Sequence, residues 1–278
     1  MKISIVIPNF NCARYLEQTL KSVLAQNVNG LEVIVIDGGS TDNSVDIIKR
    51  YKQHLAYWVS ERDSGQSDAI NKGLKRCQGE IVNWINSDDL LAVGALNAIA
   101  AGFSRFPEAD FVYGDTQVID EFGLLLQARP EIGFIDFVQR YGGNLFAQPS
   151  CFFRRAAAER LGWLNPSLHW SMDYDFYLRA LNQRMVFRSV PAFIGQFRLH
   201  GGSKTGAQHA KFIEEHFRVH CLHTSSWLLR QRTTYRLLKL LARSWRVYQL
   251  WRQRGVWQPG RYSRMLTGLA RQGDKPAH

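Results

Sequence analysis

The chain has 278 residues, of which 45% are hydrophobic and 12% aromatic, and its formal net charge is +11. This length accommodates one large α/β domain with an appendage or two small domains, and the apolar content is ample for a packed core. Its four cysteines are more than 60 residues apart, which argues against a disulfide framework or a zinc site and fits a reducing compartment.

Membrane and secretory segments are not indicated by the pattern of apolar residues. No uninterrupted apolar run approaches the ~18 residues that a membrane-spanning helix needs. Segment 2–7, Lys-Ile-Ser-Ile-Val-Ile, is too short for a secretory signal and has the composition of a strand. We therefore expect a cytoplasmic protein. A peripheral position on the inner face of the cell membrane is compatible with this expectation.

The positive charge is concentrated at the end of the chain. Residues 205–278 hold 14 of the 35 Lys and Arg but 3 of the 24 Asp and Glu, so residues 1–204 hold 21 of each sign. The protein is therefore predicted to be a neutral body with a basic tail. A tail of this sign attracts phosphate groups, either on anionic lipid or on nucleic acid.

The first half of the chain alternates strand and helix patterns. Short β-branched runs predict buried strands, and apolar residues at helical spacing predict the helices between them. The expected strands are 3–7, 32–36, 56–60 and 81–85, and the expected helices are 13–26, 45–51 and 68–77, the second capped by Ser40, Thr41 or Asp42. This alternation predicts an α/β fold with a doubly wound, Rossmann-like and mainly parallel sheet.

The second half is mixed. Segments 111–115 and 117–120 read as strands around a bend, 130–150 as loops, 173–181 as a helix, and 186–190 and 192–198 as strands. We expect these elements to extend the same sheet, with no linker before about residue 205. The predicted organisation is a domain over 1–205, with a nucleotide-binding half (1–110) and an acceptor half (111–205), and a basic helical extension over 206–278.

Residues 227–251 of the extension have the pattern of an amphipathic helix. At 100° per residue, five basic residues share one face and five apolar residues share the opposite face. The basic face holds Arg232, Arg236, Lys239, Arg243 and Arg246, and the apolar face holds Leu237, Leu238, Leu241, Trp245 and Tyr248. This pattern suits a helix at an anionic membrane surface or a terminal helix packed on the body with solvated arginines. Nucleic acid is the least favoured partner.

An acidic pair follows the strand predicted at 81–85. Segment 86–89 reads Asn-Ser-Asp-Asp, and ligands of open α/β sheets bind beyond the carboxyl ends of the strands. Asp88 and Asp89 repel each other unless a cation compensates, and Mg²⁺ binds proteins through one or two carboxylates plus substrate phosphates. The alternative is that one of them caps a helix beginning at Leu90.

Another acidic residue, Asp37, directly follows the strand predicted at 32–36. Asp37 precedes Gly38 and Gly39, which let the backbone approach a ligand, and it is expected beside Pro8 and Asn9 at the end of the first strand. Together these residues indicate a nucleotide pocket, whereas Asp37 and its glycines alone indicate a turn.

Two further residues complete the candidate site. Asp173 lies near the start of the helix predicted at 173–181, where it is either a helix cap or a general base for an acceptor hydroxyl. His200 follows the last predicted strand, where it is either a metal or phosphate ligand or an ordinary loop residue.

Successive blocks over about residues 3–205 resemble the signature of family 2 glycosyltransferases with the GT-A fold. The blocks are segment 5–11 (Ile-Val-Ile-Pro-Asn-Phe-Asn), segment 35–42, segment 64–73, segment 84–89, segment 172–175 (Met-Asp-Tyr-Asp) and segment 198–200 (Arg-Leu-His). The resemblance implies an inverting transfer of sugar from a nucleotide-linked donor, usually of the UDP or dTDP type, with Mg²⁺ or Mn²⁺.

The resemblance also implies roles for single residues. Carried over by position, Asp37 contacts the nucleobase, with Pro8 and Asn9 in the same pocket, and Asp68 belongs to the donor loop. Asp88 contacts the ribose or the metal, and Asp89 and His200 are metal ligands. Asp173 is the catalytic base. The chain departs from the family in two places. Asn86 replaces the first acid of the acidic triplet, and Met172 replaces the Glu that usually precedes the base.

The acceptor implied by the resemblance and the basic tail is a saccharide or lipid-linked saccharide of a bacterial surface polysaccharide. Two other functions stay open at this point. One is nucleotidyl transfer, although segment 8–11 lacks the glycine- and basic-rich loop usual after the first strand of such enzymes. The other is a catalytically silent nucleotide-sugar binder or scaffold.

Overall fold

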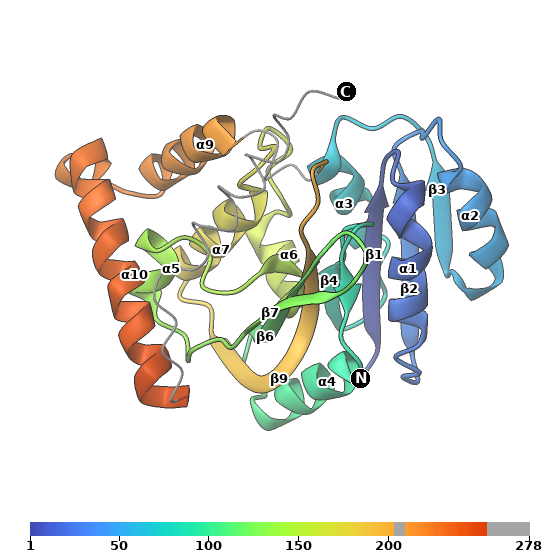
Figure 1. The fold of residues 1–278 in the computed structure, drawn as a ribbon, viewed down its shortest axis with the longest axis horizontal. Coiled ribbons are helices and arrows are strands. Elements are labelled where there is room, and N and C mark those ends of the chain that lie inside the picture. Colours follow the sequence, from blue (N-terminus) through green and yellow to red (C-terminus); the bar gives the residue numbers. More distant parts are fainter. Residues whose placement is uncertain (203–208, 255–278) are drawn as a thin grey trace, which may run out of the picture.

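The computed structural model describes residues 1–202 and 209–254 of the chain (Figure 1). The first part of the chain alternates strands and helices, as its periodicity predicts. Its elements are β1 (Ile3–Asn9), α1 (Ala13–Leu24), β2 (Leu31–Asp37), α2 (Ser44–Tyr51), η1 (Lys52–His54), β3 (Tyr57–Ser60), α3 (Gln66–Leu74), β4 (Ile81–Trp84), β5 (Leu90–Leu91) and α4 (Ala95–Arg105).

The middle of the chain adds longer strands and the helix that carries Asp173. Its elements are β6 (Phe111–Ile119), β7 (Leu125–Arg129), α5 (Asp136–Tyr141), η2 (Gln148–Ser150), β8 (Cys151–Arg154), α6 (Arg155–Leu161), α7 (Met172–Asn182) and β9 (Phe187–Arg198). The last described elements are helical, namely α9 (His209–Leu222), η3 (Leu228–Arg230) and α10 (Arg232–Arg254).

All nine strands in the described part of the chain form one mixed sheet. Its order is β3-β2-β1-β4-β8-β6-β9-β5. β7 lies off this path and pairs with the second half of β6. The β3, β2, β1 and β4 strands are parallel, β8 is antiparallel to both of its neighbours, and β9 is parallel to β6. The predicted α/β class with a Rossmann-like mixed sheet and flanking helices is confirmed. The antiparallel pairs are those of β8 with β4 and β6, of β7 with β6, and of β5 with β9.

Alternation along β1 explains how helices cover both faces of the sheet. Ile3, Ile5 and Ile7 belong to the core cluster shared with α1, α2 and α4. Val6 belongs to the cluster on the other face, shared with α3 and α7. Because successive side chains of a strand point to opposite faces, β1 is buried on both sides.

The structure differs from the sequence-based prediction in the second half. Two strands expected on either side of residue 191 are one strand, β9, and the two expected around residue 116 are one strand, β6. The pairing of β6 with β9 shifts register on either side of Asp115, near Pro191, which has no N–H for the ladder. The prediction of breaks was wrong because the sheet absorbs them as irregularities within continuous strands.

The C-terminal helices lie beside the acceptor half of the sheet. α9 packs against α7, and α10 packs against α5, at the left of Figure 1. The predicted domain boundary near residue 205 and the end of the predicted extension fall in 203–208 and 255–278, outside the described residues. The division into a body and an extension therefore stays a prediction. Within the described residues, no helix is both long and apolar enough to cross a bilayer.

Candidate active site at the carboxyl edge of the parallel strands

The ends of the parallel strands bring polar residues from distant segments to one edge of the sheet. Asn9, the last residue of β1, pairs with Asp37, the last residue of β2, and Asp37 pairs with Ser60, the last residue of β3. Segment 86–89 follows β4 on the other side of β1, where Ile85 N donates to Val6 O at 2.8 Å. These segments therefore share the edge at which α/β sheets bind ligands.

Asp37 is fully buried, and its carboxylate accepts hydrogen bonds from three residues. Its carboxylate accepts from Asn9 Nδ2, Ser40 Oγ and Ser60 Oγ at 2.6 Å each, and from Ser40 N at 2.9 Å. Burial raises the pKa of Asp37, but the hydrogen bonds from Ser40 and Ser60 outweigh it and lower the pKa below its usual value. Asp37 is thus a stable anion that fixes the ends of three strands, and it also closes the turn that the alternative interpretation predicted.

The glycines after Asp37 allow close backbone packing. A Cβ on Gly38 would lie 2.6 Å from Asp63 Oδ2, and Gly39 has φ of +80°. The loop before α3 therefore packs directly on the turn after β2. Pro8 sits in β1 opposite Ile36 and is part of the wall of this region.

Asp88 and His200 form a hydrogen-bonded pair, although they are 112 residues apart. His200 Nε2 lies 3.0 Å from Asp88 Oδ2, and both side chains are partly exposed. The His200 ring rests on Tyr15, with 4.8 Å between centroids. The alternative interpretation, a helix cap at Asp88 or Asp89, is wrong, because Leu90–Leu91 is a strand and the next helix begins at Ala95.

Asp89 is held differently from Asp88. It is 1% exposed, and its carboxylate accepts from the Arg198 backbone N at 2.9 Å and from Asn86 Nδ2 at 3.2 Å. Burial, followed by the charge of Asp88, raises the pKa of Asp89 well above its usual value. Asp89 thereby ties the end of β9, and with it His200, to the loop after β4. Its assignment as a metal ligand stays a prediction.

The start of α3 connects the two halves of the site. Asp68 accepts from Ser64 N at 3.0 Å and lies 3.5 Å from Lys72 Nζ, so it shapes the loop before the helix. Gln66 Nε2 donates to Asn86 Oδ1 at 2.8 Å. On the other side, Ser67 Oγ lies 3.0 Å from Leu168 O.

Met172 lies against the same serine, with Sδ 3.1 Å from Ser67 Oγ, and is followed by Asp173. Asp173 is the second residue of α7 and is not its N-cap, which is Ser171, so the capping alternative is wrong. Its carboxylate accepts from Asn144 Nδ2 at 2.6 Å and from Tyr174 N at 2.7 Å. Burial raises the pKa of Asp173 to about 6, against the lowering effect of these hydrogen bonds.

Two residues of this region were not found from the sequence. Glu215 of α9 is buried and accepts from the backbone N of His169, Trp170 and Ser171 at 3.1, 2.7 and 2.8 Å. It fixes the segment that leads into α7 from more than 40 residues away. Asn144, in the segment predicted as loop, lies 29 residues before the aspartate it contacts. No local sequence spacing indicates either contact.

The donor set fits a hard divalent cation only together with a substrate. In residues 1–202 and 209–254, no group of three or more His, Cys, Asp and Glu could hold a metal ion. Asp88 and His200 offer one carboxylate and one imidazole at a partly open position. Since Mg²⁺-type ions are commonly bound by one or two carboxylates and substrate phosphates, these two residues fit a cation that a diphosphate helps to coordinate.

This fold and this edge of polar residues define a GT-A type transferase. The profile of Glycosyl transferase family 2 matches residues 4–162, more than half of the chain, and the protein belongs to that family. The resemblance seen in the sequence is thereby confirmed.

The curated relatives of this chain are glycosyltransferases. Chondroitin synthase of Escherichia coli is 27% identical over 222 residues, which cover 78% of this chain but 32% of that protein. A PGL/p-HBAD biosynthesis glycosyltransferase of Mycobacterium bovis is 26% identical over 226 residues, covering 76% of this chain and 82% of the relative. A glycosyltransferase of Nostoc is 33% identical over 130 residues, which cover 44% of this chain and 40% of that protein. The chain therefore spans less than half the length of the Nostoc and Escherichia coli relatives.

Solved structures share the fold at low sequence identity. The chain is similar to S. aureus TarS 1–349 in complex with UDP-GlcNAc, with a TM-score of 0.65, 16% identity, and coverage of 96% of this chain and 78% of that one. It is also similar to a mannosyltransferase of Pyrobaculum calidifontis in complex with GDP-Man and Mn²⁺, with a TM-score of 0.61, 18% identity, and coverage of 99% and 81%.

Proposed function

We propose that this glycosyltransferase moves a sugar, with inversion, from a nucleoside diphosphate donor to a hydroxyl of a saccharide or lipid-linked acceptor. The observation that carries the proposal is the linkage through α3. Gln66 contacts the loop of Asp88, and Ser67 contacts Met172, the residue before Asp173. These two contacts support a single site that includes both the proposed donor-binding residues and the proposed base.

The donor is proposed to lie along the ends of β1, β2 and β4. Asp37, with Pro8 and Asn9, would form the nucleobase end, and Asp68 would shape the loop beside the donor. Asp37 stays ionised because serine hydroxyls donate to it, so a base N–H would meet a preformed anion. The related structures with UDP-GlcNAc and GDP-Man support this class of donor.

Asp173 is proposed as the general base. A carboxylate with a pKa near 6 is ionised at neutral pH yet holds a proton better than an ordinary aspartate. It would remove the proton from an acceptor hydroxyl, whose oxygen bonds to the anomeric carbon from the face opposite the departing diphosphate. One displacement of this kind inverts the configuration and needs no covalent sugar–enzyme intermediate.

Asp88 and His200 are proposed to hold Mg²⁺ or Mn²⁺ with the diphosphate. A bound cation would offset the negative charge that develops on the leaving group. Asp89 is 1% exposed and each of its carboxylate oxygens already accepts a hydrogen bond, so we propose that it holds this loop in place while Asp88 faces the ligand. The Mn²⁺ in the complex of the mannosyltransferase supports the cation proposal.

The acceptor is proposed to be a growing surface saccharide handled at the inner face of the membrane. Relatives named for chondroitin synthesis and for PGL/p-HBAD biosynthesis support an acceptor of the polysaccharide or glycolipid class. The basic helix α10 supports a position next to anionic lipid.

A donor screen tests the first step. Thermal unfolding would be followed with UDP-, dTDP- and GDP-sugars in Mn²⁺ and again with a chelator, because a ligand that binds the native state raises its melting temperature. We expect one nucleotide class to raise it in Mn²⁺ and the chelator to reduce the shift. No shift with any nucleotide sugar would contradict the donor site.

The stereochemistry tests the second step. Once the donor is known, the anomeric configuration of the product, read by NMR, is expected to be opposite to that of the donor. Retention of the donor's anomeric configuration would contradict a single displacement with Asp173 as the base.

A further inference from the structure

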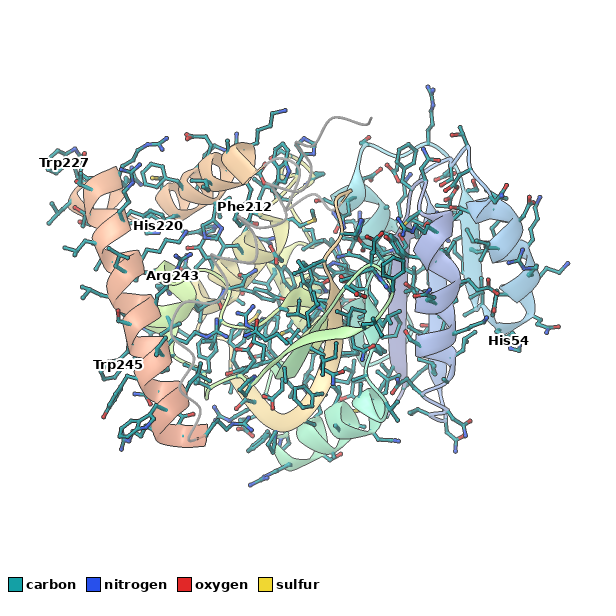
Figure 2. All side chains as sticks on the ribbon, in the orientation of Figure 1. His54, Phe212, His220, Trp227, Arg243 and Trp245 are labelled. Atoms are coloured by element: carbon teal, nitrogen blue, oxygen red, sulfur yellow. The ribbon has the colours of Figure 1, made fainter. Side chains whose placement is uncertain are left out.

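The apolar face of α10 is turned away from the protein. The residues that this helix buries against the body are Tyr235, Ala242, Gln249 and Leu250. The apolar stripe of α10, which we define as Leu237, Leu240, Leu241, Trp245, Tyr248 and Trp251, is 42–62% exposed at every position. Figure 2 shows Arg243 and Trp245 on different sides of this helix. An amphipathic helix normally buries its apolar face on its own protein, so this arrangement is reversed.

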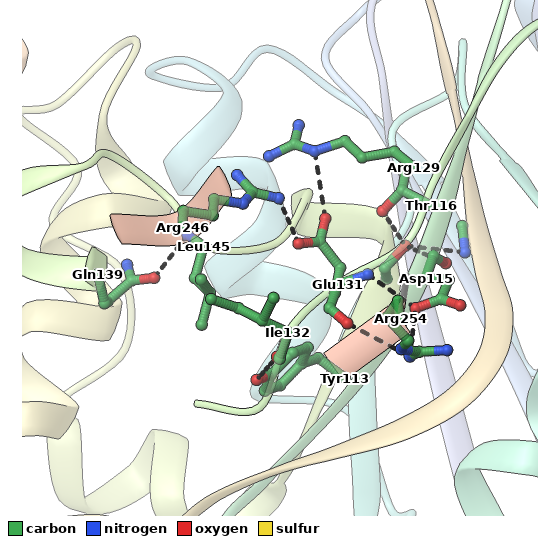
Figure 3. A network of polar contacts seen from close by, with 12 residues as sticks. Tyr113, Asp115, Thr116, Arg129, Glu131, Ile132, Gln139, Leu145, Arg246 and Arg254 are labelled. Atoms are coloured by element: carbon green, nitrogen blue, oxygen red, sulfur yellow. Dashed lines mark hydrogen bonds and ion pairs between the residues drawn. The ribbon is translucent and has the colours of Figure 1, made fainter. Parts of the chain in front are cut away.

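Ion pairs anchor α10 to the body beside the apolar contacts of Tyr235, Ala242 and Leu250 (Figure 3). Arg246 pairs with Glu131, which is 1% exposed and also lies 3.3 Å from Arg129 Nε. Arg254 lies 3.1 Å from Asp115 Oδ1. Because these buried acids hold the helix by its basic residues, the apolar stripe is left without a partner within the described part of the chain.

A groove between α9 and α10 lies beside the stripe. Its volume is about 450 Å³, and its lining includes Phe212, Ile213 and Phe217 from α9, and Lys239, Leu240 and Arg243 from α10. The exposed surface of the lining is mainly apolar, and the lining also includes the cations Arg232, Arg236, Lys239 and Arg243. This combination suits a molecule with a hydrocarbon part and an anionic head.

Three of the cations at the groove have no acidic partner among the described residues. Arg232 pairs with Glu214, whereas Arg236, Lys239 and Arg243 form no ion pair with any residue that the structure describes. Burial, followed by the charge of Arg243, lowers the pKa of Lys239 to about 8. An anion placed between these side chains would relieve their mutual repulsion.

We propose that the groove between α9 and α10 binds the phosphate head groups of an anionic bilayer while the apolar stripe of α10 enters the acyl boundary. Arg236, Lys239 and Arg243 would contact the lipid phosphates, and Phe212, Phe217 and Leu240 would contact the first acyl carbons. This assignment extends the membrane position suggested under the proposed function, but it does not depend on sugar transfer.

A lipid surface fits the two features better than other partners do. Nucleic acid would use the cations but would leave six large apolar side chains in water. A second copy of the chain would cover the stripe but would bring like-charged grooves together. An interfacial helix combines Trp, Tyr and Leu on one side with Arg and Lys beside them, as α10 does.

Sedimentation of the full chain with vesicles tests this assignment without any donor. We expect retention on vesicles of phosphatidylcholine mixed with phosphatidylglycerol, little retention on phosphatidylcholine alone, and release by salt. The double substitution Arg236→Gln and Arg243→Gln should weaken retention by roughly 25-fold, about fivefold for each cation removed. Trp245→Ala together with Leu241→Ala should weaken it by at least about tenfold.

Matched controls separate this site from general effects of charge and exposure. Lys52→Gln with Lys75→Gln removes the same charge from exposed positions elsewhere, and Val93→Ala shortens an apolar side chain that is fully exposed. Both controls should keep vesicle retention. Equal losses in the controls and in the groove variants would overturn the assignment, as would no retention on anionic vesicles.

Two other results would replace the lipid by another partner. A dimer in sedimentation velocity that Trp245→Ala dissociates, without vesicle retention, would assign the stripe to a second copy of the chain. Stabilisation by inorganic phosphate without vesicle retention would assign the groove to a free anion. Turnover with a soluble acceptor, measured on the groove variants, should be unchanged, so failure of this site and failure of the proposed chemistry are distinguishable.

Discussion

Asp37, at the end of β2, and Asp173, near the start of α7, show how the surroundings of a carboxylate set its chemistry. Asp37 accepts from two hydroxyls, an amide side chain and a backbone N–H, and these donors hold its pKa below the usual value despite burial. Asp173 has one side-chain donor, Asn144, and burial raises its pKa to about 6. The first is suited to remain an anion, and the second is suited to take up a proton.

The strongest test of this difference is Asp173→Asn. The amide keeps the shape of the side chain but has no basic oxygen, so turnover should fall by about 10³-fold while donor affinity is unchanged. Donor affinity is measured by titration, and turnover by release of the nucleoside diphosphate. Near wild-type turnover would show that another group is the base.

Asp37→Ala should act on stability. It leaves Ser40 N, the Ser60 hydroxyl and Asn9 Nδ2 without their acceptor in a buried region, which should lower the free energy of unfolding by about 3 kcal/mol. Since the pKa of Asp37 is lowered in the folded state, its contribution is present above the unfolded pKa and is lost as the pH falls through the folded value.

Urea unfolding at a series of acidic pH values measures this contribution. The variant should show a weaker loss of stability on acidification than the wild type does. Asp46→Ala is the control, because that side chain is 72% exposed on α2 and should change little. Equal behaviour of the two variants would mean that Asp37 is not a stabilising anion.

The acidic pair can be separated by two conservative substitutions. Asp88→Asn should lower Mn²⁺-dependent turnover by at least about 100-fold, because it weakens a proposed ligand. Asp89→Asn should cost about tenfold, as expected for a supporting residue, since an amide oxygen still accepts from Arg198 N. Turnover of each variant, measured as a function of Mn²⁺ concentration, distinguishes the two roles. The reverse order of effects would restore the assignment of Asp89 as the metal ligand.

The smallest predicted effect concerns pH. Asp173 must be deprotonated to act, so kcat should rise with pH through about 6 and level off above it. Asn144→Ala removes a donor that favours the ionised form, which should raise the pKa of Asp173 and move the rise to higher pH by about one unit. A pH profile of kcat decides this, and an unchanged profile would contradict the role of Asn144.

Much of the fold was readable from local patterns. The β-branched runs predicted β1, β2 and β4, and helical spacing predicted α1, α2 and α7 within a few residues. β8 was missed because a four-residue apolar strand has no detectable period. The breaks expected at Asp115 and Pro191 were wrong because neighbouring strands hold β6 and β9 continuous through them.

The sequence by itself determined that Asp37 and the pair Asp88–Asp89 follow strands, because strand ends are set by short-range pattern and parallel strands end at a common edge. Only the tertiary structure decided the partners of the acidic pair, since Asp88 contacts His200 from 112 residues away and Asp89 accepts from Arg198 N from 109 residues away. It also decided which side of α10 faces out. Helical periodicity defines two opposite faces, but the buried acids Glu131 and Asp115 determine which of them the protein binds.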